Sequence, residues 1–193
     1  DRFGYAVAIS GDYAVITAWR EDEDAIGANY LNNTGSAYIF KQTTGVWSEQ
    51  QKLVASDRAA NARFGWSAAI SGDYAIIGAV LEDKDADGLN SLSYAGSAYI
   101  FKQTAGVWSE QQKMVASDRG ANDYFGHSVA ISGDYVVVGA YRESEDASGA
   151  NTLSSAGSAY IFKQTAGVWS EQQKIVASDR ATSDLFGWSV SIS

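Results

Sequence analysis

The segment DKDADG, residues 83–88, carries Asp83, Asp85 and Asp87 at alternate positions before a glycine. This pattern is typical of loops that wrap a hard cation such as Ca²⁺, because carboxylate oxygens are the ligands and the glycine permits a sharp turn. An EF-hand loop also needs a bidentate Glu eleven residues after Asp83, where this chain has Tyr94. The segment therefore indicates a weak Ca²⁺ site, and solvated acidic loops without a cation are the alternative.

Related acidic segments lie 61 residues earlier and 61 residues later. They keep fewer of the three aligned aspartates, since Ile26, Ser144 and Ser148 stand where the middle copy has aspartate. The predicted metal ligands of the three copies are Asp22, Asp24, Asp83, Asp85, Asp87 and Asp146.

Aromatic side chains are the second candidate for chemistry. Tyr5, Trp66, His127 and Trp188 occupy one repeated position, each just after a Phe-Gly pair. Flat aromatic faces can stack on sugar rings, and packing in the core is the alternative reading. The predicted ligand-binding residues are Trp19, Tyr30, Trp66, Tyr94, His127, Tyr141 and Trp188.

Catalytic patterns are absent. The chain has no cysteine, its single histidine has no paired nucleophile or second ligand nearby in sequence, and no glycine-rich phosphate loop ends in lysine. We therefore expect a protein that is not an enzyme. The 14 basic and 23 acidic residues leave a net charge of −9, which disfavours nucleic acid, and no apolar run is long enough for membrane insertion.

These residues sit on an internal repeat. Phe-Gly recurs with a constant spacing of 61 residues, and GSAYIFKQTAGVWSEQQK stands identically at 96–113 and 157–174. We predict one domain over 1–193. Its predicted repeats are 3–63, 64–124, 125–185 and a partial fourth at 186–193.

Each repeat has the pattern of β-strands. SVAISGDYVVVGA predicts two antiparallel strands joined at Gly133-Asp134, because Gly and Asp tolerate the positive φ of a tight hairpin. GSAYIFKQT predicts a third strand, and VWSEQQKIVAS a more polar fourth strand suited to a sheet edge. A short helix is the alternative for residues 47–56.

Four antiparallel strands in each repeat predict an all-β fold, a β-propeller with three blades plus one inner strand; a solenoid is less favoured. Trp47, Trp108 and Trp169 are expected to pack between blades. Propellers close with about four to eight blades. The chain is therefore expected to be a window of a longer propeller or, alternatively, to close a ring by self-association.

The stretch FGWSAAISGDYAIIGA, residues 64–79, resembles the FG-GAP repeat of integrin α-chain propellers and bacterial surface proteins. The resemblance implies a β-propeller that presents one face to its ligands. The Pro of the Gly-Ala-Pro signature is replaced by Trp19, Val80 and Tyr141, and Thr17 replaces a Gly. The integrin-type calcium loop between the first two strands is reduced here to Gly-Asp, so that particular site is not expected.

Differences among the copies are concentrated in two kinds of connection. The long loops, after the second strand, are residues 19–34, 80–95 and 141–156, and the linkers between repeats are residues 57–63, 118–124 and 179–185. Both emerge on one face of an up-and-down sheet, and exposed loops on a rigid scaffold commonly carry binding residues. We expect an extracellular or cell-surface adhesion scaffold that binds a protein or glycan. A lectin and a structural subunit of an extracellular assembly are the alternatives.

Overall fold

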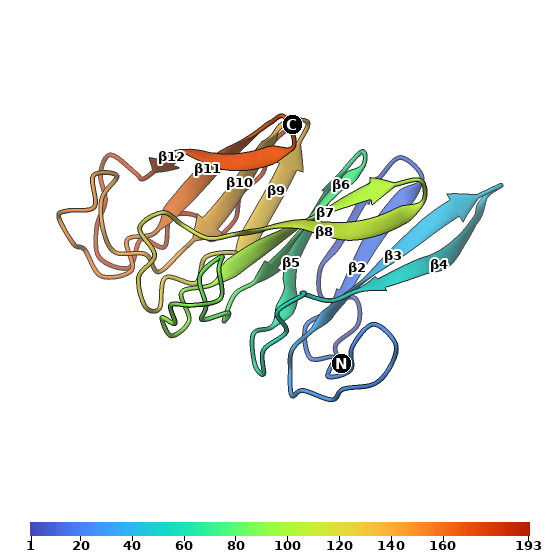
Figure 1. The fold of residues 1–193 in the computed structure, drawn as a ribbon. Coiled ribbons are helices and arrows are strands. Elements are labelled where there is room, and N and C mark those ends of the chain that lie inside the picture. Colours follow the sequence, from blue (N-terminus) through green and yellow to red (C-terminus); the bar gives the residue numbers. More distant parts are fainter.

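The computed structural model describes residues 1–193 as three four-stranded antiparallel sheets that stand side by side (Figure 1). Within each sheet the strands pair in sequence order, as in propeller blades, and the three sheets do not close a ring. The all-β prediction is confirmed, and the helix alternative for residues 47–56 is wrong because a strand covers most of that segment. No helix long and apolar enough to cross a membrane occurs in the structure.

The second, third and fourth strands have the same lengths in all three blades, whereas the first strand varies from four residues in β1 to eight in β5. The first blade comprises β1 (Val7–Ser10), β2 (Tyr13–Ala18), β3 (Ser36–Thr43) and β4 (Val46–Leu53). The second comprises β5 (Phe64–Ser71), β6 (Tyr74–Ala79), β7 (Ser97–Thr104) and β8 (Val107–Met114). The third comprises β9 (Ser128–Ser132), β10 (Tyr135–Ala140), β11 (Ser158–Thr165) and β12 (Val168–Ile175).

Two hairpins shape each blade. The Gly-Asp loop between the first two strands is confirmed, and in the third blade it joins Ser132 to Tyr135 with Gly133 at φ 52°. The loop between the last two strands places two residues at positive φ, Ala166 at 51° and Gly167 at 89°. Positive φ at both central residues is what a type I′ hairpin requires.

The fourth strand of every blade contains a β-bulge that the sequence analysis did not foresee. In the third blade Phe162 pairs with Glu171 and Ile161 pairs with Gln173, so Gln172 is the extra residue. The same shift falls at Gln50 and Gln111. A bulge increases the local twist of the strand and disrupts the ladder at a sheet edge.

The hydrophobic core lies between the blades. On β6, Ala75 and Ile77 pack against the first blade, whereas Ile76, on the opposite face, packs against the third. Because β6 is covered on both faces, its sequence is a continuous apolar run in which polar and apolar residues do not alternate. Trp108 and Trp169 are buried between blades, as predicted. Trp47 is 41% exposed, on the uncovered face of the first blade.

The Phe-Gly pairs couple successive blades. The Phe64 amide donates to the Thr34 carbonyl at 2.8 Å, and the Phe64 backbone passes so close to Gly35 that a Cβ there would overlap it. Phe-Gly forms the start of the inner strand in β5 only. β1 begins at Val7, four residues after Phe3, and β9 begins at Ser128, three residues after Phe125. Residues 186–193 make one parallel bridge, between Phe186 and Gly157.

Candidate functional site

The long loops and the linkers lie at one end of the sheets, opposite the hairpin turns (Figure 1). Arginines in the linkers form hydrogen bonds with the long loops. Arg58 Nη2 donates to the Asp22 carbonyl at 2.8 Å, Arg119 Nη2 to Asp83 at 2.7 Å and Arg180 Nη2 to Ser144 at 2.7 Å. Sequence reasoning missed this role, although Asp-Arg begins all three of the otherwise variable linkers. These bonds hold each long loop against the linker that follows it.

The predicted metal ligands are engaged mainly with their own loops. Asp146 accepts hydrogen bonds from the Ser148 hydroxyl at 2.6 Å and from the Ser148 amide at 2.8 Å. These bonds, with one from Asn151, hold the pKa of Asp146 well below its usual range. Backbone amides similarly lower the pKa of Asp24, through Ala28, and of Asp85, through Leu89.

The other three predicted metal ligands do not gather with Asp24, Asp85 and Asp146 into one group. Asp83 accepts from the Tyr94 amide at 2.7 Å, Asp22 accepts from the Asn33 amide, and Asp87 is exposed. Such side-chain to backbone bonds stabilise a turn in the loop itself. Calcium binding at these residues stays a prediction.

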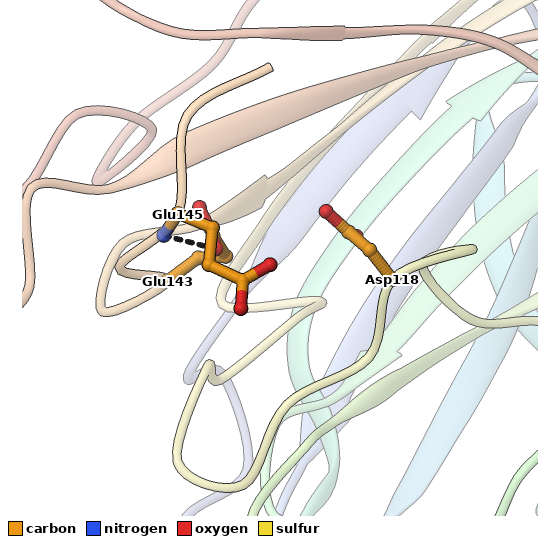
Figure 2. Close-up of side chains that lie close together, drawn as sticks. All are labelled: Asp118, Glu143 and Glu145. Atoms are coloured by element: carbon orange, nitrogen blue, oxygen red, sulfur yellow. Dashed lines mark hydrogen bonds between the residues drawn. The ribbon is translucent and has the colours of Figure 1, made fainter. Parts of the chain in front are cut away.

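The carboxylates that do gather are Asp118, Glu143 and Glu145, whose oxygens lie within 4.8 Å of one another. Figure 2 shows Asp118, from a linker, pointing toward the two glutamates of the third long loop. Lys174 already neutralises two of them, with Nζ 2.7 Å from Asp118 and 3.0 Å from Glu143. An ammonium in this position repels a metal ion, so the cluster is an ion-pair network between the second and third blades.

Asp123 lies buried near this network. Burial, together with the charges of Glu143 and Asp118, raises the pKa of Asp123 to about 6, although its hydrogen bond from the Gly120 amide acts in the opposite direction. The ionised form is therefore disfavoured in the folded protein. Ionised Asp123 therefore destabilises the folded protein above the folded pKa. This destabilisation is relieved as the pH falls through about 6 toward the unfolded pKa of 3.8.

We expect Asp123→Asn to raise the free energy of unfolding at pH 7.5 by about 1–3 kcal/mol, because a pKa unit corresponds to about 1.4 kcal/mol. Asparagine keeps an acceptor for the Gly120 amide and removes the buried charge. Urea unfolding at pH 7.5 and pH 5 measures the effect, which should shrink at pH 5. A variant less stable than the parent at both pH values would contradict this assignment.

The predicted aromatic residues form a continuous row. We call Tyr5, Trp19, Trp66, His127, Tyr141 and Trp188 the aromatic row. The ring centroids are 5.0 Å apart for Tyr5 and Trp66, 5.9 Å for Trp66 and His127, and 4.6 Å for His127 and Trp188. Because one member comes from the same position of each repeat, the row crosses all three blades.

Trp19 and Tyr141 extend the row from the ends of β2 and β10. Trp19 lies 5.4 Å from Trp66, and Tyr141 lies 4.4 Å from His127. Of the other predicted residues, Tyr94 reaches the row only through Tyr124. Tyr30 stands apart in an exposed loop, and its pKa is raised by a hydrogen bond with Asp22.

Arginines line the aromatic row, and sequence reasoning did not find them. The guanidinium carbons of Arg63, Arg20 and Arg2 lie 4.6, 4.7 and 5.2 Å from the centroid of Trp19. Arg142 lies 5.1 Å from Tyr124 and 5.6 Å from Tyr141. The available signal was that Arg20 and Arg142 directly follow Trp19 and Tyr141 in sequence. We call Arg2, Arg20, Arg63 and Arg142 the row arginines.

A repeated turn places these side chains. Arg63, Tyr124 and Leu185 all have φ between 56° and 59°, and the amide three residues later, in Trp66, His127 or Trp188, donates back to their carbonyls at 3.1–3.2 Å. Positive φ is uncommon for residues other than glycine, so the surrounding contacts must impose it. Residue 63 is thereby brought beside residue 66, with the Arg63 guanidinium 5.5 Å from the Trp66 ring.

The fold and this face define the class of protein: an all-β repeat protein built of propeller-type blades, with variable loops along one face. Residues 1–40, 47–101, 108–162 and 169–193 match the FG-GAP repeat model, and the chain belongs to the FG-GAP repeat family. FG-GAP repeat domains are generally non-catalytic and typically occur in extracellular or surface proteins. A search of curated proteins found no match.

Proposed function

We propose that the protein is a non-catalytic adhesion scaffold, outside the cell or on its surface, that binds a protein or glycan on the face of the long loops. The observation that carries this proposal is the aromatic row with its arginines on that face. The three copies differ there, whereas the Ser-Gly-Asp-Tyr hairpins at the opposite end are identical. Exposed differences on a constant scaffold are typical of binding surfaces.

Rigid support for the face favours the same reading. Each long loop is fixed by a linker arginine and by an aspartate that binds its backbone amides. A loop that is ordered before binding loses less conformational entropy when the ligand arrives. Similar loops in successive blades also allow several weak contacts to add through effective concentration.

The titratable groups of the face favour binding over catalysis. Glu143 is buried against Lys174, and burial lowers the pKa of His127, whose Nδ1 lies 3.2 Å from the Trp188 carbonyl. The lowered pKa favours the neutral form of His127, which packs between the rings of Trp66 and Trp188. A general base needs a proton to abstract within hydrogen-bond reach, and this histidine is instead engaged with a backbone carbonyl.

An adhesion assay tests the proposal. Beads coated with the protein are applied to surfaces of extracellular matrix proteins and of polysaccharides, and retention under flow is measured. We expect retention on at least one surface, and a loss of about tenfold after Arg142→Glu and Trp188→Ala, because a few anchors carry most binding energy. Equal retention for these variants and for a variant of the opposite end, Lys102→Glu, would refute a binding role for the face.

A second candidate, a structural subunit that self-associates, is supported by the uncovered sheet faces. Ile9 is 64% exposed on the first blade, whereas its counterpart Ile70 is 7% exposed between blades. On the third blade Tyr135 is exposed, whereas its counterparts pack edge-on against tryptophans, Tyr13 against Trp108 and Tyr74 against Trp169, each at 5.6 Å. A second copy could therefore bring Trp47 against Tyr135.

Light scattering after size exclusion tests this association. We expect the parent to have a mass of twice 20.6 kDa or a higher multiple at high concentration. We expect Ile9→Asp to be monomeric, because a charge on the packed face opposes burial. Residues 186–193 occupy the position that residues 3–10 of an incoming copy would take, so one segment must move aside. A monomeric mass for the parent at all concentrations would rule this candidate out.

A further inference from the structure

We propose that the aromatic row and the row arginines bind an acidic polysaccharide, a chain of sugar rings that carry carboxylates. This inference rests on the proposed function and specifies its ligand class. It depends on three features of one surface: unpaired positive charge, exposed aromatic faces, and a linear arrangement across successive blades.

The positive charge on this surface is unpaired. The protein has a net charge of −9, yet four of its seven arginines are the row arginines. All five ion pairs of the structure use lysines, and none includes a row arginine. The other three arginines, Arg58, Arg119 and Arg180, instead donate to backbone carbonyls. The row arginines therefore keep their donors available, and guanidinium matches the geometry of a carboxylate.

The aromatic rings supply a second kind of contact. Tyr5 is 43% exposed and Trp188 is 53% exposed, at opposite ends of the row. Trp66 and His127 are partly exposed between them. A sugar ring has an apolar face that can lie on an aromatic ring, and its carboxylate can reach a guanidinium held beside that ring. Arg63, whose guanidinium carbon lies 5.5 Å from the centroid of the partly exposed Trp66 ring, has this arrangement.

The arrangement suits a chain better than a single small molecule. One ring comes from the start of the inner strand of each blade, so the contacts repeat with the blades. Repeated weak contacts along one polymer add through effective concentration. Single-stranded nucleic acid, which also combines stacking faces with anionic groups, is the competing ligand class and is an outcome of the test.

Polygalacturonate is the first probe, because each of its sugar rings bears one carboxylate. Binding to the whole protein is measured by calorimetry in low salt. We expect saturable binding that weakens about tenfold when the carboxylates are methyl-esterified, since the esters keep the sugar faces and remove the charge. This comparison needs no variant and so does not depend on any variant folding.

Charge-matched variants locate the site. Arg20→Gln with Arg142→Gln should weaken binding about twofold to thirtyfold, given about 0.2–1 kcal/mol for each of the two exposed ionic contacts. Lys41→Gln with Lys102→Gln removes the same charge at the hairpin end, where the two lysines lie over Tyr13 and Tyr74 at 5.3 Å each. The lysine variant should bind as the parent does, and both should melt as the parent does.

Three outcomes overturn the inference. These are no binding of either form of the polymer by the parent, equal binding by the two double variants, and binding of single-stranded DNA that is as tight as that of polygalacturonate. If the beads described above still adhere through the loop face to another surface, the adhesion scaffold stands and only the ligand class is wrong. If adhesion through that face is absent as well, both proposals fail.

Discussion

Trp108→Ala is expected to lower the free energy of unfolding by about 3–5 kcal/mol, whereas Trp47→Ala is expected to lower it by about 1 kcal/mol or less. The two tryptophans occupy the same position of successive repeats and differ in their surroundings. Trp108 is 2% exposed between the first and second blades, and Trp47 is 41% exposed on the uncovered face.

The contacts of Trp108 explain the size of its effect. Its ring packs edge-on against Tyr13 at 5.6 Å and fills the space between two blades, so alanine would leave a cavity. The backbone of Trp108 also exchanges two hydrogen bonds with the Gln51 amide side chain, at 2.7 and 2.9 Å, and alanine keeps both. The indole N–H is buried without a partner, so losing it offsets a small part of the cost.

Chemical denaturation of the parent and both variants measures the difference, and Trp169→Ala serves as a second buried example. Thermal unfolding at two protein concentrations is the control for association. Equal losses for Trp47 and Trp108 would contradict the expectation. If that equality disappeared on dilution, it would indicate that a second copy covers the first blade in solution.

The strands were predictable because both of their signals are local. A Gly-Asp pair between two apolar runs specifies a hairpin through backbone sterics alone, and alternation in GSAYIFKQT specifies an extended segment. The bulge at Gln172 was not predictable, because it depends on the pairing register of two strands. The identity of Gln50, Gln111 and Gln172 in the three copies was visible, but nothing in it distinguishes a bulge from a regular strand residue.

The candidate site was predictable in part. The aromatic positions followed from the repeat spacing, because residues 5, 66, 127 and 188 occupy the same position of successive repeats. The row arginines did not follow, because Arg63, in the linker after the first blade, reaches back to the ring of Trp19 at the end of β2. Lys174 pairs across a blade boundary in the same way, with Asp118 of the linker. Contacts between repeats depend on how the blades pack, and sequence periodicity contains no measure of that packing.

Lys174→Ala is expected to lower the free energy of unfolding at pH 8 by about 3–5 kcal/mol, because it leaves buried carboxylates without a partner. The Lys174 side chain is 6% exposed and that of Glu143 is 3% exposed. Burial lowers the pKa of Lys174, but the hydrogen bonds to Asp118 and Glu143 outweigh burial and raise the pKa above 10.5. The stability that this lysine contributes is therefore present below the unfolded pKa and is lost as the pH rises through the folded one.

The pH dependence of the variant separates this mechanism from a simple loss of packing. Without the ammonium, Asp118, Asp123, Glu143 and Glu145 repel one another when ionised, so the loss should shrink between pH 8 and pH 4.5 as protons bind. Lys163→Ala on the same blade, whose ammonium lies over the exposed Tyr135 at 5.4 Å, should change stability by about 0.5 kcal/mol or less at either pH. Urea unfolding of both variants at the two pH values measures this. A loss for Lys174→Ala that stayed constant with pH would show that its alkyl chain, packed between the blades, matters more than its charge.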